Sequence, residues 1–198
     1  MDFAGPLYLT TTEEDVTERK LHKAYICLYM CASTRALHLE LVPNLSVSTF
    51  LQPFRRFTTR RGLPTKLLSE NAKSFKAASK EVNGIVRSAE VQRYFANKGI
   101  TWDFIVEKAP WQRGFWERMV KCVKRCLKKV IGHASLSFEE MSTLLIEVEA
   151  TLNNRPITNV YNEEEGVSYL LTPAKLIYGR NIATTPKDQH FKIISQGF

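Results

Sequence analysis

The chain has 198 residues and a mass of 22.7 kDa, with 44% hydrophobic and 24% charged residues. This length suits a single domain with its own core, and the composition excludes a wholly disordered chain, a collagen or a coiled coil. The longest apolar run, Ala24 to Ala32, has nine residues, well short of the ~20 of a membrane-spanning helix, so we expect no membrane contact. No signal-peptide pattern opens the sequence.

The formal net charge of +8 is concentrated in two stretches of the chain. Residues 55–66 contain five Lys and Arg, residues 118–129 contain six, and neither stretch contains an acid. Because clustered cations raise the local electrostatic potential, two such stretches favour a polyanion such as nucleic acid as the partner. Two solvated helix faces are the alternative explanation.

The four cysteines form two C-x3-C pairs, Cys27 with Cys31 and Cys122 with Cys126. This spacing differs from the C-x2-C pairs of zinc sites, and no histidine lies nearby at zinc-finger spacing. We expect reduced thiols that pack as small core residues.

Hydrophobic patterns in the first half of the chain predict strands and one helix. The expected strands are a short first strand ending near Asp2, then residues 22–33, 35–42 and 66–69. Ser46 is an N-cap candidate for a helix that ends at Arg61, before a glycine. Pro53 inside that helix is expected to kink it or delay its start.

The second half of the chain predicts strands and helices in alternation. The expected elements are a helix at 88–98, a strand at 101–106, a loop at 107–114, and helices at 115–131, 138–154 and 173–178. Ser137 and Glu140 form a capping box before an apolar stripe at helical spacing. An initial hairpin followed by alternating elements predicts a mixed α/β sheet with helices on its faces.

Three acidic residues stand where sheet edges and helix starts converge: Asp2, Glu70 after the strand 66–69, and Glu117 in the first turn of the helix 115–131. Several carboxylates at one place suit Mg²⁺ or Mn²⁺, and two such ions about 3.5–4 Å apart activate a nucleophile and stabilise the leaving oxygen of a phosphodiester. The alternatives are a turn residue, a surface loop residue and a helix-dipole partner, respectively.

Several blocks, in this order, resemble the catalytic core of a retroviral-type integrase of BEL/Pao-like LTR retrotransposons. They include Asp-Phe-Ala-Gly-Pro-Leu, Ala-Tyr-Ile-Cys-Leu-Tyr, Ser-Thr-Arg-Ala-Leu-His-Leu-Glu-Leu, Ser-Glu-Asn-Ala-Lys-Ser-Phe and Ala-Pro-Trp-Gln-Arg-Gly-Phe-Trp-Glu-Arg-Met-Val. The resemblance covers residue 2 to about residue 180 and implies an RNase H-like fold, with a five-stranded mixed sheet flanked by helices. We therefore expect a core domain at 1–180, with its first strand truncated at the N-terminus, and a loosely ordered tail at 181–198.

The resemblance also implies the chemistry. Asp2, Glu70 and Glu117 are expected to bind two Mg²⁺ or Mn²⁺ ions for the processing and joining of DNA ends, first with water and then with the freed 3′-hydroxyl as nucleophile. Asn71 is expected to support the residue at position 70. The expected DNA-contacting residues are Arg113, Arg118, Lys121, Lys124, Arg125 and Lys128. DNA as substrate implies a nuclear location, and we expect a homodimer or a larger homo-oligomer.

Two residues depart from the pattern of the family. Glu70 stands where the family has Asp, and the added methylene displaces a carboxylate that must meet strict Mg²⁺ geometry. Arg113 stands where the loop before Glu117 usually has glycine, which reduces backbone freedom. A catalytically decayed core that only binds nucleic acid or protein is therefore the alternative function, and a remnant without function is a third.

Overall fold

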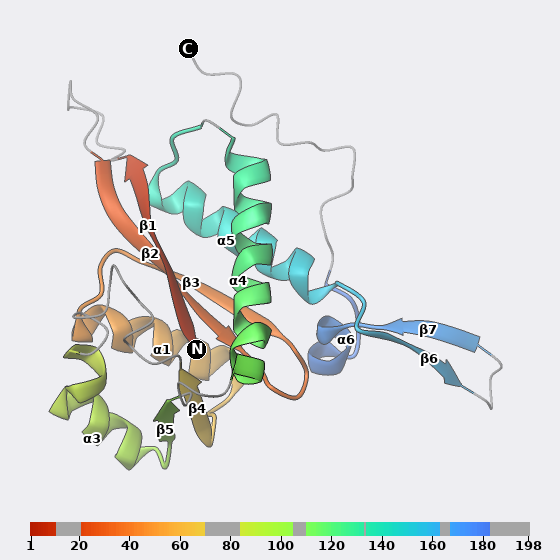
Figure 1. Ribbon diagram of the computed structural model, residues 1–198, viewed down its shortest axis with the longest axis horizontal. Coiled ribbons are helices and arrows are strands. Elements are labelled where there is room, and N and C mark those ends of the chain that lie inside the picture. The colour runs from red at the N-terminus through yellow and green to blue at the C-terminus, as the bar shows by residue number, and fades with distance from the viewer. Residues whose placement is uncertain (11–20, 70–83, 105–109, 133, 163–166, 183–198) are drawn as a thin grey trace.

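The computed structural model describes residues 1–10, 21–69, 84–104, 110–132, 134–162 and 167–182 (Figure 1). In chain order the elements are β1 (Asp2–Thr10), β2 (Leu21–Met30), β3 (Leu37–Val42), α1 (Val47–Arg61), β4 (Lys66–Ser69), α3 (Ala89–Asn97), β5 (Thr101–Phe104), α4 (Pro110–Ile131), α5 (Phe138–Asn153), β6 (Thr158–Asn162), β7 (Val167–Leu171) and α6 (Pro173–Tyr178). From β1 to α5, the order of strands and helices is the predicted one. In this described part of the chain, no helix is both long and apolar enough to span a bilayer.

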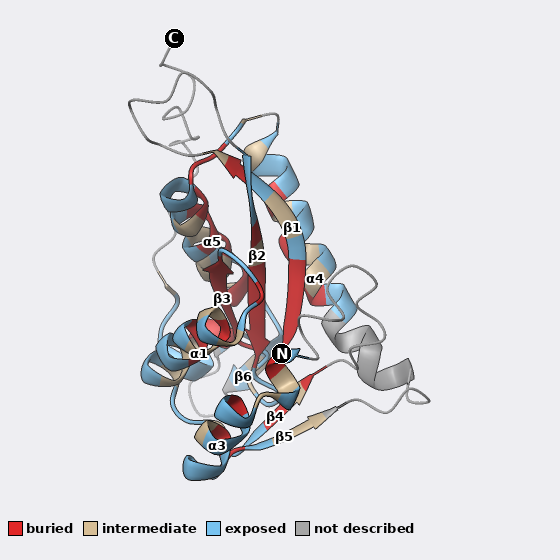
Figure 2. Ribbon diagram, turned by 90° about the vertical axis from the view of Figure 1, so that its left-hand side faces the viewer, coloured by how far each residue is buried: buried red, intermediate tan, exposed pale blue. Residues whose placement is uncertain are grey.

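Helices cover both faces of an antiparallel sheet with the strand order β1-β2-β3 (Figure 2). Because successive strand residues point to opposite faces, β2 contributes to two separate cores. Ile26 and Leu28 pack with buried residues of α4 and α5, whereas Cys27 and Tyr29 pack with buried residues of α1 and α3. The sheet therefore separates α4 and α5 from α1 and α3.

The prediction of one five-stranded sheet is wrong for the hydrogen-bonded strands described here. All five predicted strands are present, but β4 and β5 form a separate parallel pair and β6 and β7 a separate antiparallel pair. The ladder of β1 begins at Asp2, and a hydrogen bond from the Met1 amino group to the Leu68 carbonyl oxygen at 2.5 Å places the start of β1 beside β4. The first strand and β4 are thus neighbours without a shared ladder.

Local capping signals explain where several helices begin and end. Ser46 and Ser137 each form a capping box with the third residue of the following helix, as the sequence predicts for Ser137. The predicted delay of the helix start by Pro53 is wrong, because α1 begins at Val47, directly after Ser46, and runs to Arg61 as one helix that contains Pro53. Pro53 is buried beside Phe50 and Phe54, so the packing of its ring offsets the lost backbone hydrogen bond.

The second half of the chain differs from the prediction at two places. The long helix α4 begins at Pro110, which places Arg113 inside the helix instead of in a loop; proline suits the first helical turn because that turn needs no N–H donor. The hairpin of β6 and β7 was not predicted at all, although Val167–Leu171 is a short apolar run.

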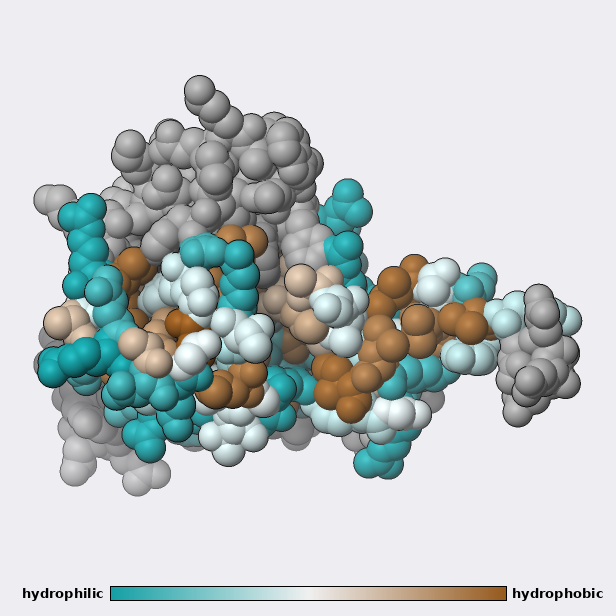
Figure 3. Space-filling model, turned by 90° about the horizontal axis from the view of Figure 1, so that it is seen from below, coloured by the Kyte–Doolittle hydropathy of each residue, from teal (hydrophilic) through white to brown (hydrophobic). Residues whose placement is uncertain are grey.

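The β6–β7 hairpin projects away from the two helical layers (Figure 1). Apolar side chains gather along it and along the adjoining α6 (Figure 3). Tyr161 is 64% exposed and Leu170 is 51% exposed. A two-stranded ribbon with this much exposed apolar surface gains little stability from its own packing.

The outer edge of β3 is bonded to side chains of α5. Asn153 accepts a hydrogen bond from the Leu37 N–H at 2.7 Å and donates one to the Leu37 carbonyl oxygen at 2.8 Å. Glu149 accepts a hydrogen bond from the Leu39 N–H at 2.8 Å. Four residues rise about 6 Å along a helix and two rise about 7 Å along a strand, so the two side chains meet alternate strand residues. These hydrogen bonds occupy backbone groups of an edge strand that could otherwise pair with another strand.

A network of charges joins this edge to α1. The imidazole of His38, a buried residue, lies 3.1 Å from Glu40 through Nε2 and 3.3 Å from Glu149 through Nδ1. Glu40 also pairs with Arg56 at 2.7 Å and with Arg60 at 3.5 Å. Arg61 pairs with Glu149 and donates a hydrogen bond to the Tyr178 hydroxyl. These contacts connect α1, β3, α5 and α6.

The network shifts two pKa values in opposite directions. Burial by itself lowers the pKa of His38, but the hydrogen bonds and charges of Glu149 and Glu40 outweigh burial, and the pKa lies above 6.5. Burial by itself raises the pKa of Glu40, but the hydrogen bonds and charges of His38 and Arg56 outweigh burial, and the pKa lies below 4.5. Folding thus favours a protonated His38 beside an ionised Glu40.

We predict that this network stabilises the fold most between pH 4.5 and 6.5. The contribution of His38 is complete below its unfolded pKa and is lost as the pH rises through the raised folded value. The contribution of Glu40 is lost as the pH falls through its lowered folded value. Urea midpoints measured from within this range to higher pH should fall above pH 6.5 in the native chain and stay flatter in His38→Gln. The control is His22→Gln, because His22 is exposed on β2; equal curves for native chain and His38→Gln contradict the prediction.

Candidate functional site

The first predicted metal ligand, Asp2, opens β1 instead of ending a short strand. Asp2 is 8% exposed, and its Oδ1 accepts a hydrogen bond from the Phe3 N–H at 2.7 Å. In the ladder it faces Leu28, and it lies on the same side of the strand as Ala4. Both Leu28 and Ala4 belong to the core of α4 and α5. The Asp2 carboxylate is therefore on the face of the sheet that α4 covers.

The end of β4 lies beside the start of β1. The hydrogen bond from Met1 to Leu68 places the last residues of β4 beside the start of β1. Ser69, the last residue of β4, is buried and accepts a hydrogen bond from Trp102 Nε1 at 2.9 Å. Glu70 and Asn71 follow directly in the chain but lie outside the described residues. The structure therefore describes the strand that leads to these two residues, but not the residues themselves.

The third predicted ligand, Glu117, lies on α4. The buried Met119, two residues later, packs in the same core as Ala4 and Leu28, so this part of α4 covers the Asp2 face of the sheet. Figure 1 shows the start of β1 at the level of the lower end of α4. The Glu117 side chain is 56% exposed, and its Oε2 lies 4.0 Å from Lys121 Nζ.

The donor set of this site consists of carboxylates, which are the ligands that Mg²⁺ and Mn²⁺ prefer. Asp2 on β1 and Glu117 on α4 come from elements that pack against the same face of the sheet. Among the described residues, no group of three His, Cys, Asp or Glu is close enough together to bind a metal ion. The chemistry of the two described carboxylates suits a divalent cation, and the third predicted ligand, Glu70, lies outside the described residues.

Exposed cations form a stripe on α4, which we call the α4 stripe. Its members are Arg118, Lys121, Lys124, Arg125 and Lys128. At about 100° per residue, these positions fall within roughly a third of the helix circumference, the third that also includes Glu117. Met119, Val123 and Leu127 are buried in the core. Arg113 belongs to the same helix, in its first turns, where only the backbone is described.

Sequence reasoning missed the buried network of His38, Glu40 and Glu149. A signal was present, because two ionisable residues alternate with leucines in the strand 37–42. The predicted packing of the cysteines is confirmed for Cys27, which is buried, whereas Cys31 is exposed.

Comparison with models of known protein families finds no match, and comparison with curated proteins finds none either. Solved structures do match. The chain is similar to the simian T-cell lymphotropic virus intasome in complex with PP2A regulatory subunit B56 gamma, with a TM-score of 0.57 and 13% identity over 94% of this chain. It spans 57% of the length of that chain.

Two isolated integrase domains match over nearly their whole length. The HTLV-2 integrase catalytic core domain in complex with magnesium, in its trimeric form, has a TM-score of 0.54 and 13% identity over 89% of this chain and 95% of that one. The BIV integrase catalytic core domain has a TM-score of 0.53 and 14% identity over 89% of this chain and 92% of that one. The chain therefore has the RNase H-like α/β fold of retroviral integrase catalytic cores.

Proposed function

We propose that the chain is a DNA-integration domain that cleaves phosphodiester bonds and joins element DNA ends to target DNA. The observation that supports this function is that Asp2 and Glu117 come from β1 and α4, which pack on one face of an integrase-like fold, and that the α4 stripe begins directly after Glu117. The order of the sequence blocks supports assignment to BEL/Pao-like LTR retrotransposons, and DNA as substrate places the protein in the nucleus.

In this proposal each residue has a physical task. Asp2, Glu117 and Glu70 bind Mg²⁺ or Mn²⁺, which when bound activates the nucleophile and stabilises the leaving oxygen. The buried strand holds the Asp2 carboxylate in place through the Phe3 N–H. The α4 stripe neutralises backbone phosphates without reading bases, and Lys121 screens Glu117 from the approaching phosphate. Asn71 supports the ligand at position 70, and Arg113 adds a cation to the DNA path.

The oligomeric state belongs to the same proposal. The HTLV-2 core domain was solved in dimeric and trimeric forms. We propose that this chain also acts as a homodimer or a larger homo-oligomer, because joining two DNA ends to one target requires two sites.

The alternative function is nucleic-acid binding without chemistry. The observation that favours it is Glu70, because the added methylene moves a carboxylate by roughly 1 Å, and such a displacement costs on the order of 100-fold in rate.

The test is a cleavage and joining assay on branched DNA oligonucleotides in Mg²⁺ and in Mn²⁺. We expect native activity to fall at least about 100-fold in Glu117→Gln, which corresponds to about 2.7 kcal/mol of transition-state stabilisation. The matched control is Glu90→Gln, because Glu90 is exposed on α3, on the other face of the sheet, and it should keep native activity.

Glu70→Asp distinguishes the two functions. Activity in the native chain, lost in Glu117→Gln, supports the proposed enzyme. Activity that appears only in Glu70→Asp establishes the binding function and shows that the native chain has lost the chemistry. Absence of activity from both chains, at protein concentrations that bind the DNA fully, overturns the enzymatic proposal.

A further inference from the structure

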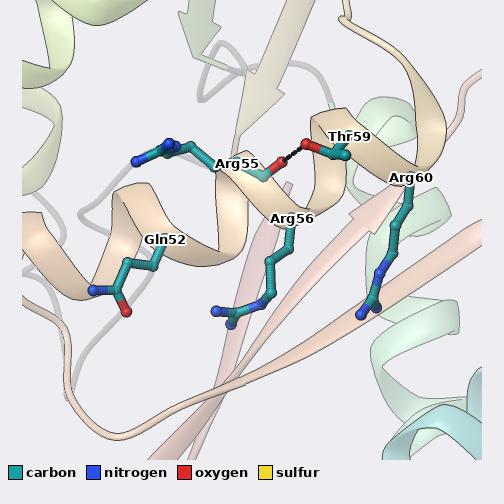
Figure 4. A pocket seen from close by; sticks show the side chains of 5 residues that line it. All are labelled: Gln52, Arg55, Arg56, Thr59 and Arg60. Carbon is teal, nitrogen blue, oxygen red and sulfur yellow. Dashed lines mark hydrogen bonds between the residues drawn. The ribbon is translucent and has the colours of Figure 1, made fainter.

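A second basic surface lies on α1. The helix contains four arginines and no acid. On its outer side, exposed arginines alternate with neutral polar residues, and this surface, the α1 arginine face, consists of Gln52, Arg55, Arg56, Thr59 and Arg60 (Figure 4). Together they line a shallow hollow of about 400 Å³. Gln52, Arg56 and Arg60 extend to the same side of the helix (Figure 4).

The α1 arginine face continues toward α3. A neighbouring hollow of about 360 Å³ shares Arg55 and Thr59 with the first and adds Tyr94 and Lys98 among its lining residues. Among the described residues, no acid lines either hollow. The two hollows thus form one basic path over α1 to the end of α3.

The charge of this path is only partly neutralised. Arg56 and Arg60 share one carboxylate, that of Glu40, which is 7% exposed and lies beneath them. The side chains of Arg56 and Arg60 are still 43% and 57% exposed. Within the described ranges, no acid forms an ion pair with Arg55 or Lys98. An excess of positive charge therefore faces solvent.

This surface is distinct from the α4 stripe. Phe50 and Phe54 of α1 belong to the core on one side of the sheet, and Met119, Val123 and Leu127 of α4 belong to the core on the other (Figure 2). One straight segment of duplex cannot follow both surfaces, because a sheet with its packed helices separates them by about 20 Å, two packing layers of ~10 Å each.

We propose that the α1 arginine face binds the sugar-phosphate backbone of a duplex nucleic acid segment, separate from the segment held at α4, without reading its sequence. Arginine forks, an amide and a hydroxyl are the groups that proteins use to contact backbone phosphates. Protein partners instead select surfaces with an apolar centre, and the described residues that line the first hollow include no large apolar side chain. The inference goes beyond the proposed function, because it requires binding and no cleavage.

The test is the salt dependence of binding, measured by fluorescence anisotropy with a labelled random-sequence DNA duplex in EDTA. Arg55→Glu leaves the Glu40 pairs intact and is expected to weaken binding at least about five-fold and to reduce the slope of log K against log salt by about 1. Lys98→Glu should act in the same direction. The matched control is Arg93→Glu, because Arg93 is exposed on α3 and lines neither hollow; it should change affinity less than about two-fold.

Additional measurements identify the ligand. An RNA duplex of the same length tells whether the backbone contact prefers DNA. The effects of Arg55→Glu and Lys124→Glu should add in free energy if the two surfaces contact separate phosphates.

Equal effects of Arg55→Glu and Arg93→Glu overturn the proposal. Competition by polyglutamate as strong as by DNA assigns the surface to an acidic protein, and a change in sedimentation with unchanged DNA binding assigns it to a second copy of the chain; either outcome also overturns it. Because EDTA excludes metal-dependent cleavage, these outcomes are independent of the enzymatic assay.

Discussion

Glu149→Ala is expected to lower the free energy of unfolding by about 4 kcal/mol. The carboxylate accepts a hydrogen bond from the Leu39 N–H at 2.8 Å and pairs with Arg61, and both side chains of the pair are only 12% exposed. Its loss leaves a buried guanidinium without a counter-charge and an edge-strand N–H without an acceptor, and removing one partner of a buried pair costs about 3–5 kcal/mol. Urea unfolding monitored by circular dichroism measures the effect.

The same helix provides the control. Glu147 is two residues away on α5, and its Oε2 is buried without a hydrogen-bond partner among the described residues. Glu147→Ala removes an unpaired buried oxygen and should therefore not lower the free energy of unfolding by more than about 1 kcal/mol. Glu149→Gln keeps an oxygen for the Leu39 N–H and should lose less than Glu149→Ala. A loss below about 1 kcal/mol for Glu149→Ala contradicts the interpretation, because it means that water screens the network.

Much of the fold follows from local signals in the sequence. The capping box at Ser137 and Glu140, and the glycine after α6, mark helix ends because they satisfy backbone groups through neighbouring residues. The start of α4 was predicted too late because Pro110 and Gly114 were interpreted as loop residues, although proline fits a first helical turn. The β6–β7 hairpin was missed because its stability depends on strand pairing, which a local pattern does not specify.

The separation of the sheet into ladders was also beyond local reasoning. The sequence predicts that β1 and β4 exist, but the number of hydrogen bonds between them depends on their register in space. The structure shows a hydrogen bond from Met1, the residue before β1, to Leu68 of β4. The candidate site, too, could be predicted only in part from local spacing. The spacing within α4 predicts that Lys121 and Lys124 share a face with Glu117, whereas the side of the sheet occupied by Asp2 is known only from its pairing with Leu28.

The edge of β3 shows why some strong interactions have no sequence signal. Asn153 and Glu149 are separated by more than 100 positions from the strand residues that they contact, as the 116-residue separation between Asn153 and Leu37 illustrates. An asparagine at the end of a helix ordinarily indicates a C-cap, and the cap is the next residue, Asn154. Only the fold shows that Asn153 is fully buried and bonded to both backbone groups of Leu37.

Asn153→Asp is expected to lower the free energy of unfolding by at least about 3 kcal/mol at pH 7. The substitution keeps the size of the side chain and the acceptor for the Leu37 N–H. It replaces the amide donor by a charged oxygen at the place of Nδ2, which lies 2.8 Å from the Leu37 carbonyl oxygen, in a position that is 0% exposed. Acid that protonates the new carboxyl group restores a donor, so the loss should shrink as the pH falls.

Asn154→Asp is the matched control. The neighbouring side chain makes the same kind of two-point contact, to the N–H of Ile182 at 3.0 Å and to its carbonyl oxygen at 2.7 Å, but it is only partly buried. Both substitutions place a negative charge at the C-terminal end of α5, so the unfavourable interaction with the helix dipole, about 0.5 kcal/mol, cancels in the comparison. The remaining difference measures the cost of a buried donor lost at the edge of β3. If the two variants unfold at the same urea concentration, the prediction is contradicted. Water then reaches the backbone groups of Leu37, and the hydrogen bonds between α5 and β3 do not shield them from solvent.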